Sequence, residues 1–302
     1  MKTKRWKTAA FALSAALIWG MAFAFQRMAA EHIQPFTFNF YRGVLATPCL
    51  GLFLWLRRKK TGHVDPPGGW KRLLLGGVVC GALLFLAANL QQKGIEGTEA
   101  GKAGFITTLY IVLVPVLGVI FLRERVPLRL WVSVAAATAG LYLICVRNGF
   151  TLERSDIYIL LCAVVYAFYI IAVDYFVRNL DPVALSFVHF GVSAVLSGVL
   201  AFTLETPTWA ALKPCFWAVA YVGVLSSAVA YTLQFAAQQM DSPVTVTLLL
   251  STESVFSLLG GLVLLGERLT LREGIGCVVM FGAVILAQLP EEWLYRKKRS
   301  TT

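Results

Sequence analysis

Ten apolar segments follow one another along the chain, each of about the 20 residues that a helix needs to cross the hydrocarbon core of a bilayer. Charged or Pro/Gly-rich breaks separate them. In lipid every backbone N–H and C=O must be satisfied internally, which leaves helices or closed barrels, and the alternation typical of barrel strands is absent. We therefore predict an all-α integral membrane protein of ten transmembrane helices. The segments lie near 7–28, 36–56, 70–90, 103–122, 129–146, 157–177, 183–204, 214–238, 244–265 and 273–289.

The composition excludes a water-soluble globular protein. Hydrophobic residues make up 58% of the 302 residues and charged residues 14%, whereas soluble domains have roughly 45–50% and 25%. The longest clear break between apolar segments, 57–69, is too short for a soluble domain.

The lysines and arginines behind the net charge of +11 are concentrated in the breaks on one side of the predicted membrane. Because this distribution sets the orientation of a membrane protein, we expect no nucleic-acid partner. With the N-terminus in the cytoplasm, 18 of the 27 lysines and arginines fall on the cytoplasmic side, 8 fall on the other side, and Arg42 lies within a helix. This is the positive-inside bias. It predicts a multi-pass protein of the inner or plasma membrane with both termini cytoplasmic. The basic start followed by 9–25 has features of a signal peptide, but we expect it to be kept as the first helix, since it has a counterpart in the second half of the chain.

The second half of the chain repeats landmarks of the first half at a nearly constant spacing. The spacing is 147 positions through most of the chain and 143 after a four-residue deletion. Chance pairing of apolar residues would not keep one spacing through proline, tryptophan and glutamine. The aligned pairs include Trp70 with Trp217, Gln91 with Gln238, Gln34-Pro35 with Asp181-Pro182, and Glu124-Arg125 with Glu267-Arg268.

Each half contains five predicted helices, so the second half must be inverted relative to the first. We expect the boundary to divide the chain into residues 1–150 and 151–302. Inverted repeats are typical of secondary transporters, in which a substrate site near the midplane of the membrane lies at the repeat interface. They also occur in channels, so the pattern favours transport without specifying its mechanism.

Several motifs resemble the EamA-type members of the drug/metabolite transporter superfamily, and the resemblance covers essentially the whole chain. They are Trp19-Gly20, Pro35, Tyr41-Arg42-Gly43 and the stretches 103–143 and 251–286. The most specific is the doubled Glu-Arg motif after the fourth and ninth helices. The resemblance implies a transporter that moves small metabolites such as amino acids, often in the outward direction. It also implies a cavity lined by helices 1, 3, 4, 6, 8 and 9, with helices 5 and 10 at the periphery.

Glu253 is the first candidate for a functional residue. It is predicted about eight residues inside the ninth helix, where a charged side chain is costly unless it faces a cavity or a partner. There it could couple transport to protons or bind a substrate ammonium. The alternative is a protonated carboxyl that only joins two helices. The family often has proline after this glutamate, whereas this chain has Ser254, and the matching position of the first half is Tyr110.

Aromatic and amide side chains on the other predicted helices are further candidates for a substrate pocket, since aromatic faces hold organic cations and amides bind amino and carboxyl groups. Some follow helical spacing, and tryptophan and tyrosine near helix ends could instead anchor the protein at the membrane interface. The predicted substrate-binding residues are Glu253, Trp19, Phe23, Asn89, Tyr110, Tyr166, Tyr169, Tyr231 and Gln234; Gln26, Gln92 and Gln238 belong to the wider set.

Other polar residues within the apolar segments are better explained by structure. Arg42 could meet a substrate carboxylate, but we favour a structural role for it, as for His189 at the equivalent position. Arg27 and Asp174, also equivalent, could be gates, although solvated helix ends are the simpler interpretation. For the repeated Glu-Arg motifs we expect ion pairs that stabilise turns.

The sequence contains no pattern of a catalytic or ATP-driven protein. There is no HExxH, Gly-x-Ser-x-Gly or Walker motif, and the six cysteines form no CxxC pair, so we expect no enzyme, cofactor or metal. A membrane-embedded enzyme, a lipid-handling protein and a receptor are less favoured. Export of amino acids or similar metabolites and transport of organic cations or drugs both remain open. Substrate identity, direction, coupling to protons and the choice between monomer and homo-oligomer are not determined.

Overall fold

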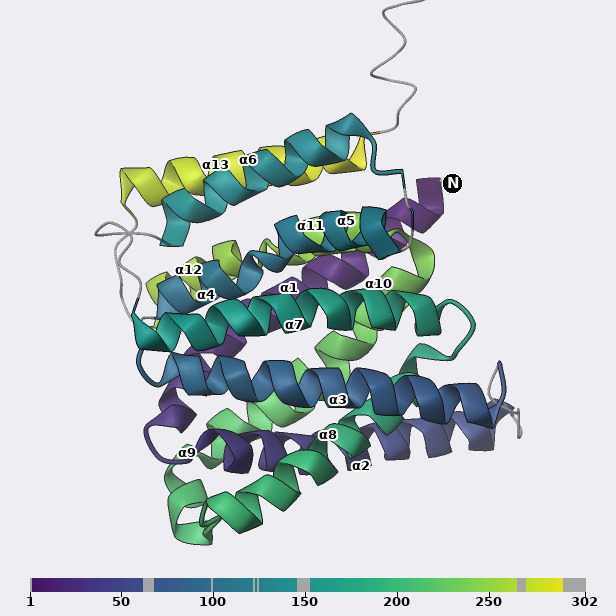
Figure 1. Ribbon diagram of the computed structural model, residues 1–302, viewed down its shortest axis with the longest axis vertical. Coiled ribbons are helices and arrows are strands. Elements are labelled where there is room, and N and C mark those ends of the chain that lie inside the picture. The colour runs from purple at the N-terminus through teal and green to yellow at the C-terminus, as the bar shows by residue number, and fades with distance from the viewer. Residues whose placement is uncertain are drawn as a thin grey trace, which may run out of the picture.

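The computed structural model describes residues 2–61, 68–98, 100–121, 123, 125–145, 153–264 and 270–289, and every regular element within them is helical (Figure 1). The predicted all-α fold is therefore confirmed. The first residue of α1 and the last residue of α13 lie at the same end of the bundle, as an even number of crossings requires (Figure 1).

Across the described residues the elements form ten rods, because three of the rods consist of more than one element. The α4 helix continues into α5, α9 continues through a π-helix, η1, into α10, and α11 continues into α12. The ten rods agree with the ten predicted segments to within a few residues. Their bounds are α1 Lys2–Ala30, α2 Pro35–Thr61, α3 Trp70–Ile95, α4 Ala100–Thr108 with α5 Tyr110–Phe121, α6 Leu128–Cys145, α7 Arg154–Val177, α8 Pro182–Leu204, α9 Trp209–Tyr221 with η1 Val222–Ala230 and α10 Tyr231–Met240, α11 Pro243–Leu250 with α12 Glu253–Leu264, and α13 Leu271–Gln288.

Six of the rods are long and apolar enough to cross a membrane by the criteria of length and composition alone. Two further apolar stretches, 128–144 and 243–258, are shorter. The six are Arg5–Ala30, Trp70–Ile95, Ala103–Phe121, Arg154–Val177, Pro182–Leu204 and Trp209–Met240.

The packing of α2 against α8 shows the symmetry between the two halves of the chain. A Cβ atom on Gly51 of α2 would lie 3.1 Å from the ring of Phe187 on α8, and a Cβ atom on Gly198 of α8 would lie 2.8 Å from the ring of Phe40 on α2. Both the two glycines and the two phenylalanines are separated by the repeat spacing of 147 positions. The contact is therefore reciprocal, as expected for two inverted repeats that meet about a pseudo-twofold axis.

The ends of the same two helices are joined by polar contacts. At one end Arg57 of α2 forms a 2.9 Å ion pair with Asp181, which caps the N-terminus of α8. At the other end Glu205, just after α8, accepts hydrogen bonds from the backbone N–H groups of Phe36 and Thr37 in the first turn of α2. The two helices are thus antiparallel, and the first turn of each is held by the other.

The α6 and α13 helices pack against each other at one edge of the bundle, above α11 and α5 in the view of Figure 1. Their backbones cross closely at Gly140 and Gly276, where a Cβ atom on either glycine would lie 2.8 Å from the carbonyl oxygen of the other. Close backbone approach through small residues is typical of helix packing in membranes. These are the fifth and tenth rods, and none of their described side chains lines the cavity described below, so the expected peripheral position holds.

Candidate functional site

A small cavity of about 50 Å³ lies at the centre of the bundle, between the two halves of the chain. Such a volume has room for a few water molecules and is well below the roughly 300–1,000 Å³ of pockets that hold drug-sized ligands. The first, third, fourth, sixth, eighth and ninth rods all contribute to its wall, as the resemblance implied. The second rod, α2, adds one residue. The wall consists of Trp19, Phe23, Gln26, Arg42, Gln91, Thr107, Tyr110, Tyr166, Tyr169, Ile170, Ser226, Tyr231, Gln234, Leu250 and Glu253.

Two broken helices meet at this cavity. The fourth rod is interrupted at Leu109, and the ninth at 251–252, so that Tyr110 and Glu253 are the first residues of α5 and α12. Glu253 thus lies inside the ninth rod as predicted, but the break directly before it was not predicted. Hydroxyl groups bond back to the preceding turn at the second break: Ser251 donates to the carbonyl of Leu248 and Thr252 to that of Leu249. Such bonds bend helices and satisfy backbone groups that the break releases.

The carboxyl group of Glu253 lies where the two breaks face each other. Its Oε1 atom accepts a hydrogen bond from Thr108 Oγ1 at 3.1 Å and a longer one from the hydroxyl of Tyr110 at 3.5 Å. The residue is only 5% exposed, and within the described part of the chain no lysine, arginine or histidine lies within ion-pair distance of it. The two repeat-equivalent positions, 110 and 253, therefore contact each other across the interface between the halves.

Glycine at position 20 brings α1 against the start of α12. A Cβ atom there would lie 2.6 Å from the carbonyl oxygen of Glu253 and 2.8 Å from the backbone nitrogen of Ser257. No other residue type fits this approach without moving a backbone. Trp19 is thereby held beside the cavity, and its indole N–H donates to the carbonyl of Ser226 at 3.1 Å.

The π-helix η1 packs against α1 and forms the adjacent part of the wall. Single π-type turns inside α-helices often occur at functional sites, and here the wider turn presents the carbonyl of Ser226 to Trp19 and the hydroxyl of Ser227 to Arg42. Tyr231 follows directly after η1. Its ring lies 4.8 Å from that of Trp19, measured between centroids, and its hydroxyl lies 3.3 Å from the hydroxyl of Tyr166. The result is an aromatic wall whose polar atoms are partly satisfied by one another.

Most of the predicted substrate-binding residues line this cavity, and one does not. Asn89 lies outside the central wall, where it accepts a hydrogen bond from Asn39 and lines a second, more open cavity between α2, α3, α7 and α8. The residues placed together in the central wall are Trp19, Phe23, Tyr110, Tyr166, Tyr169, Tyr231, Gln234 and Glu253.

The glutamines have different environments. Gln26 and Gln234 line the cavity, and Oε1 of Gln234 is buried without a hydrogen-bond partner among the described residues. Gln92 and Gln238 instead donate to the carbonyls of Gln26 and Ile170, so their amides join helices. The Oε1 atoms of Gln92 and Gln238 are also buried without a partner among the described residues, but of these four glutamines only Gln26 and Gln234 line the cavity, where they can offer polar atoms to a bound molecule.

Sequence reasoning missed the position of Arg42. We favoured a structural role over contact with a substrate carboxylate, but its side chain is 5% exposed and lies in the cavity wall. In the structure η1 approaches α2 closely beside Arg42, since a Cβ atom on Gly223 would lie 2.7 Å from Leu45 and 3.2 Å from the carbonyl of Arg42. Ser227 of η1 then accepts a hydrogen bond from Arg42 Nε at 2.9 Å. Gln91, Thr107 and Ser226 are also wall residues that we did not predict.

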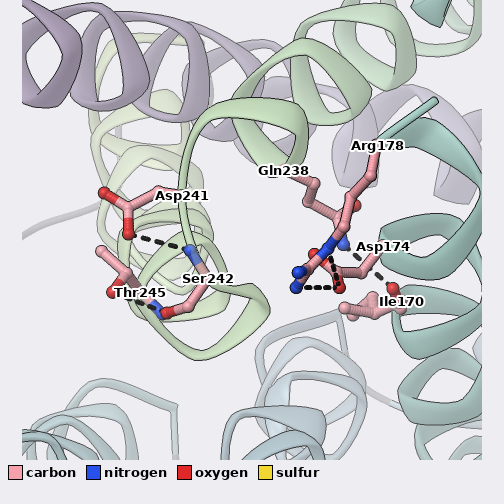
Figure 2. A network of polar contacts seen from close by, with 7 residues as sticks. All are labelled: Ile170, Asp174, Arg178, Gln238, Asp241, Ser242 and Thr245. Atoms are coloured by element: carbon pink, nitrogen blue, oxygen red, sulfur yellow. Dashed lines mark hydrogen bonds and ion pairs between the residues drawn. The ribbon is translucent and has the colours of Figure 1, made fainter. Parts of the chain in front are cut away.

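Asp174 and Arg27 are not simple solvated helix ends. Asp174 is 1% exposed and pairs with Arg178 one turn later at 2.7 Å, beside the bond from Gln238 to Ile170 (Figure 2). Arg27 is exposed but donates to the carbonyls of Ile95 and Thr98. The expectation of solvation was wrong for Asp174, because α7 is covered there by the end of α10.

His189 has the environment of a packing residue. It is fully buried, with its ring nitrogens 3.3 Å from the hydroxyl of Tyr169 and 3.1 Å from the carbonyl of Ser186. Glu124 and the pair Glu267-Arg268, for which turn-stabilising ion pairs were expected, lie outside the described residues. Among the residues that are described, no cluster of histidine, cysteine, aspartate and glutamate could hold a metal ion.

Two inverted repeats, two broken helices and a polar cavity between them define a polytopic membrane transporter. The sequence profile of the EamA-like transporter family matches residues 6–146 and 154–289. The chain belongs to the EamA-like transporter family, and each half contains one copy of the family's domain. It is a transporter and not an enzyme.

Curated relatives and a solved structure agree with this assignment. The chain is 29% identical over 278 residues to an uncharacterized transporter of Archaeoglobus fulgidus, covering 91% of this chain and 83% of the relative. It is 26% identical over 265 residues to the uncharacterized transporter YxxF of Bacillus subtilis, covering 85% and 83%. A crystal structure with 18% sequence identity superposes with a TM-score of 0.75 over 97% of this chain and 99% of that one, which shows a shared fold.

Proposed function

We propose that this transporter exports small polar metabolites, with amino acids as the model substrate, by alternating access at the interface of its two repeats. The contact of Thr108 and Tyr110 with Glu253 supports this most directly. It joins the two broken helices, one from each half, inside the cavity. A relative motion of the halves must change this contact and the wall of the cavity together.

Glu253 is the proposed centre of both recognition and coupling. It is the one carboxylate among the described residues of the cavity wall, and buried charges are normally paired. A substrate ammonium or a proton can supply the missing positive charge, and exchange of one for the other would couple transport to the proton gradient. Trp19 and Tyr231 add aromatic faces that attract cations. The proposed substrate-binding set is that predicted from the sequence; Asn89 belongs to it only if substrate also enters the second cavity.

Transport of organic cations or drugs is the second candidate function, and the combination of Glu253 with the aromatic wall favours it. The volume of about 50 Å³ favours the smaller polar substrates. A thermal-shift screen of the purified protein separates the two, because a ligand that binds only the folded state stabilises it by roughly 2.7 kcal/mol at 100 times its Kd. We expect neutral amino acids to raise the melting temperature. Stabilisation by bulky organic cations alone would contradict the proposal.

The repeat spacing of 147 positions supports a division into two repeats of residues 1–150 and 151–302, and the positive-inside bias supports both termini on the cytoplasmic side of the plasma membrane. A protease site fused to either terminus should then be cut in inside-out vesicles and protected in intact cells. Cleavage of either site in intact cells would contradict this topology.

A further inference from the structure

Arg42 is a buried cation without a counter-charge in the described part of the chain. It is 5% exposed, and no aspartate or glutamate described lies within ion-pair distance of it. Arginine is almost never fully buried unless it is paired, because removing its charge from water is costly. The neighbours of Arg42 that are seen are neutral. Its Nε atom donates to Ser227 Oγ at 2.9 Å, Nη1 donates to Asn39 Oδ1 at 3.4 Å, and its guanidinium carbon lies 5.9 Å from the ring centroid of Tyr231.

A chain of hydrogen bonds fixes the orientation of this side chain. The Nδ2 group of Asn39 donates to Asn89 Oδ1 at 3.0 Å and to the carbonyl of Pro35. The Oδ1 atom of Asn39 is thereby left to face Arg42. Asn89 in turn donates to the carbonyl of Phe85 and, at 3.4 Å, to Ser197 Oγ. The chain crosses from α8 through α3 to α2, so three helices determine where the guanidinium lies.

The cavity therefore carries opposite charges that have no partners among the described residues: Arg42 on one part of its wall and Glu253 on another. A simple anion would satisfy Arg42 alone, and a simple cation would satisfy Glu253 alone. Both together are satisfied by one molecule that bears a carboxylate and an ammonium. The unpartnered Oε1 atom of Gln234 is a further acceptor for the N–H groups of such an ammonium.

We propose that Arg42 is the anion-binding residue of the cavity and selects substrates that carry a carboxylate, while Asn39 and Asn89 are the positioning residues that hold its guanidinium in place. The substrate class is then a small zwitterion whose ammonium faces Glu253. This inference rests on the proposed function, since it names the substrate of the same site. It excludes simple amines and organic cations as preferred substrates.

The test compares a neutral amino acid with its methyl ester and with the amine that lacks the carboxyl group. Binding to the purified full-length protein and counterflow in proteoliposomes are measured for all three. In the wild type we expect at least a tenfold preference for the amino acid. Equal binding of the three compounds by the wild type would overturn the inference without any variant. Transport of all three would at the same time leave the proposed function standing.

Two substitutions locate the preference at Arg42. Arg42→Gln should weaken binding of the amino acid at least tenfold and leave binding of the ester and the amine unchanged or stronger, because Glu253 remains. Arg42→Lys keeps the charge and should retain part of the preference even if Arg42→Gln does not fold. An equal loss for all three compounds in both variants would show a purely structural role and overturn the proposal. Failure of the wild type to bind or transport any of the compounds would instead count against the proposed function.

Substitution of a positioning residue should change the substrate preference less than substitution of Arg42 does. Asn89→Ala should lower the preference for the amino acid over its ester about threefold to fivefold by loosening Asn39 and so Arg42, without changing binding of the ester. Thr203, which bonds within its own helix and is exposed, provides the matched control as Thr203→Ala. If the Asn89→Ala variant prefers the amino acid over its ester as strongly as the wild type does, Asn89 is not a positioning residue.

Discussion

Substitution of Glu253 by glutamine is expected to lower substrate counterflow about tenfold or more while leaving the protein folded. Glutamine keeps an oxygen that can accept from Thr108 and Tyr110, so the junction of the broken helices is preserved. It removes the negative charge that faces the substrate ammonium. Loss of one partner from a buried charge pair costs roughly 2–5 kcal/mol, and each 1.4 kcal/mol is a factor of ten in affinity. Initial rates in proteoliposomes, normalised to monodisperse protein, measure the effect.

Glu96→Gln is the matched control for this experiment. Glu96 forms an exposed ion pair with Lys93 outside the central cavity, so its loss changes the net charge equally but should leave counterflow unchanged. If the Glu253→Gln variant transports a neutral amino acid at the wild-type rate but no longer responds to an imposed pH gradient, the carboxylate couples transport and does not bind the substrate. Wild-type rates with an intact pH response would remove Glu253 from the site.

Substitution of Gly20 by alanine is expected to have the largest effect on stability. The added methyl group would lie 2.6 Å from the carbonyl oxygen of Glu253 and 2.7 Å from Cβ of Phe256, which forces α1 and α12 apart. Overpacking of this kind typically costs about 1–3 kcal/mol. Because the displaced atoms include the backbone of Glu253, counterflow should fall as well. Melting temperature in detergent and counterflow rate should therefore decrease together.

Gly104→Ala is the appropriate comparison, since a Cβ atom on Gly104 would meet nothing within 4 Å. Replacing glycine by alanine inside a helix is favourable by roughly 1 kcal/mol when there is space. We expect this variant to be as stable as the wild type or more so. A Gly20→Ala protein with the melting temperature of the Gly104→Ala protein would show that α1 does not approach α12 as closely as described.

The number, bounds and inverted arrangement of the rods were predictable from the sequence, since each depends on local apolarity and on the repeat. The break in the ninth rod was not. No glycine or proline occupies 251–252, and the interruption is maintained by hydroxyl groups that bond to the preceding turn. Serine and threonine also occur in uninterrupted membrane helices, so their presence does not indicate a break.

The site could be predicted only in part. Aromatic and amide residues at helical spacing on the first, sixth and eighth helices correctly indicated which side chains lie together, because such residues have few favourable positions facing lipid. The cavity position of Arg42 could not be found in this way. It depends on the close approach of α2 to η1 at Gly223 and on the orientation of Asn39, which are tertiary contacts between segments far apart in the chain.

Counterflow of a labelled neutral amino acid into proteoliposomes loaded with the same unlabelled compound tests the central claim most directly, because it requires a site that binds substrate and opens to both sides in turn. We predict transient accumulation of label that depends on the internal substrate and is strongly reduced in the Glu253→Gln variant. No accumulation above protein-free liposomes for any neutral amino acid, or accumulation that Glu253→Gln and Arg42→Gln leave unchanged, would contradict the claim that the cavity between the repeats is the transport site.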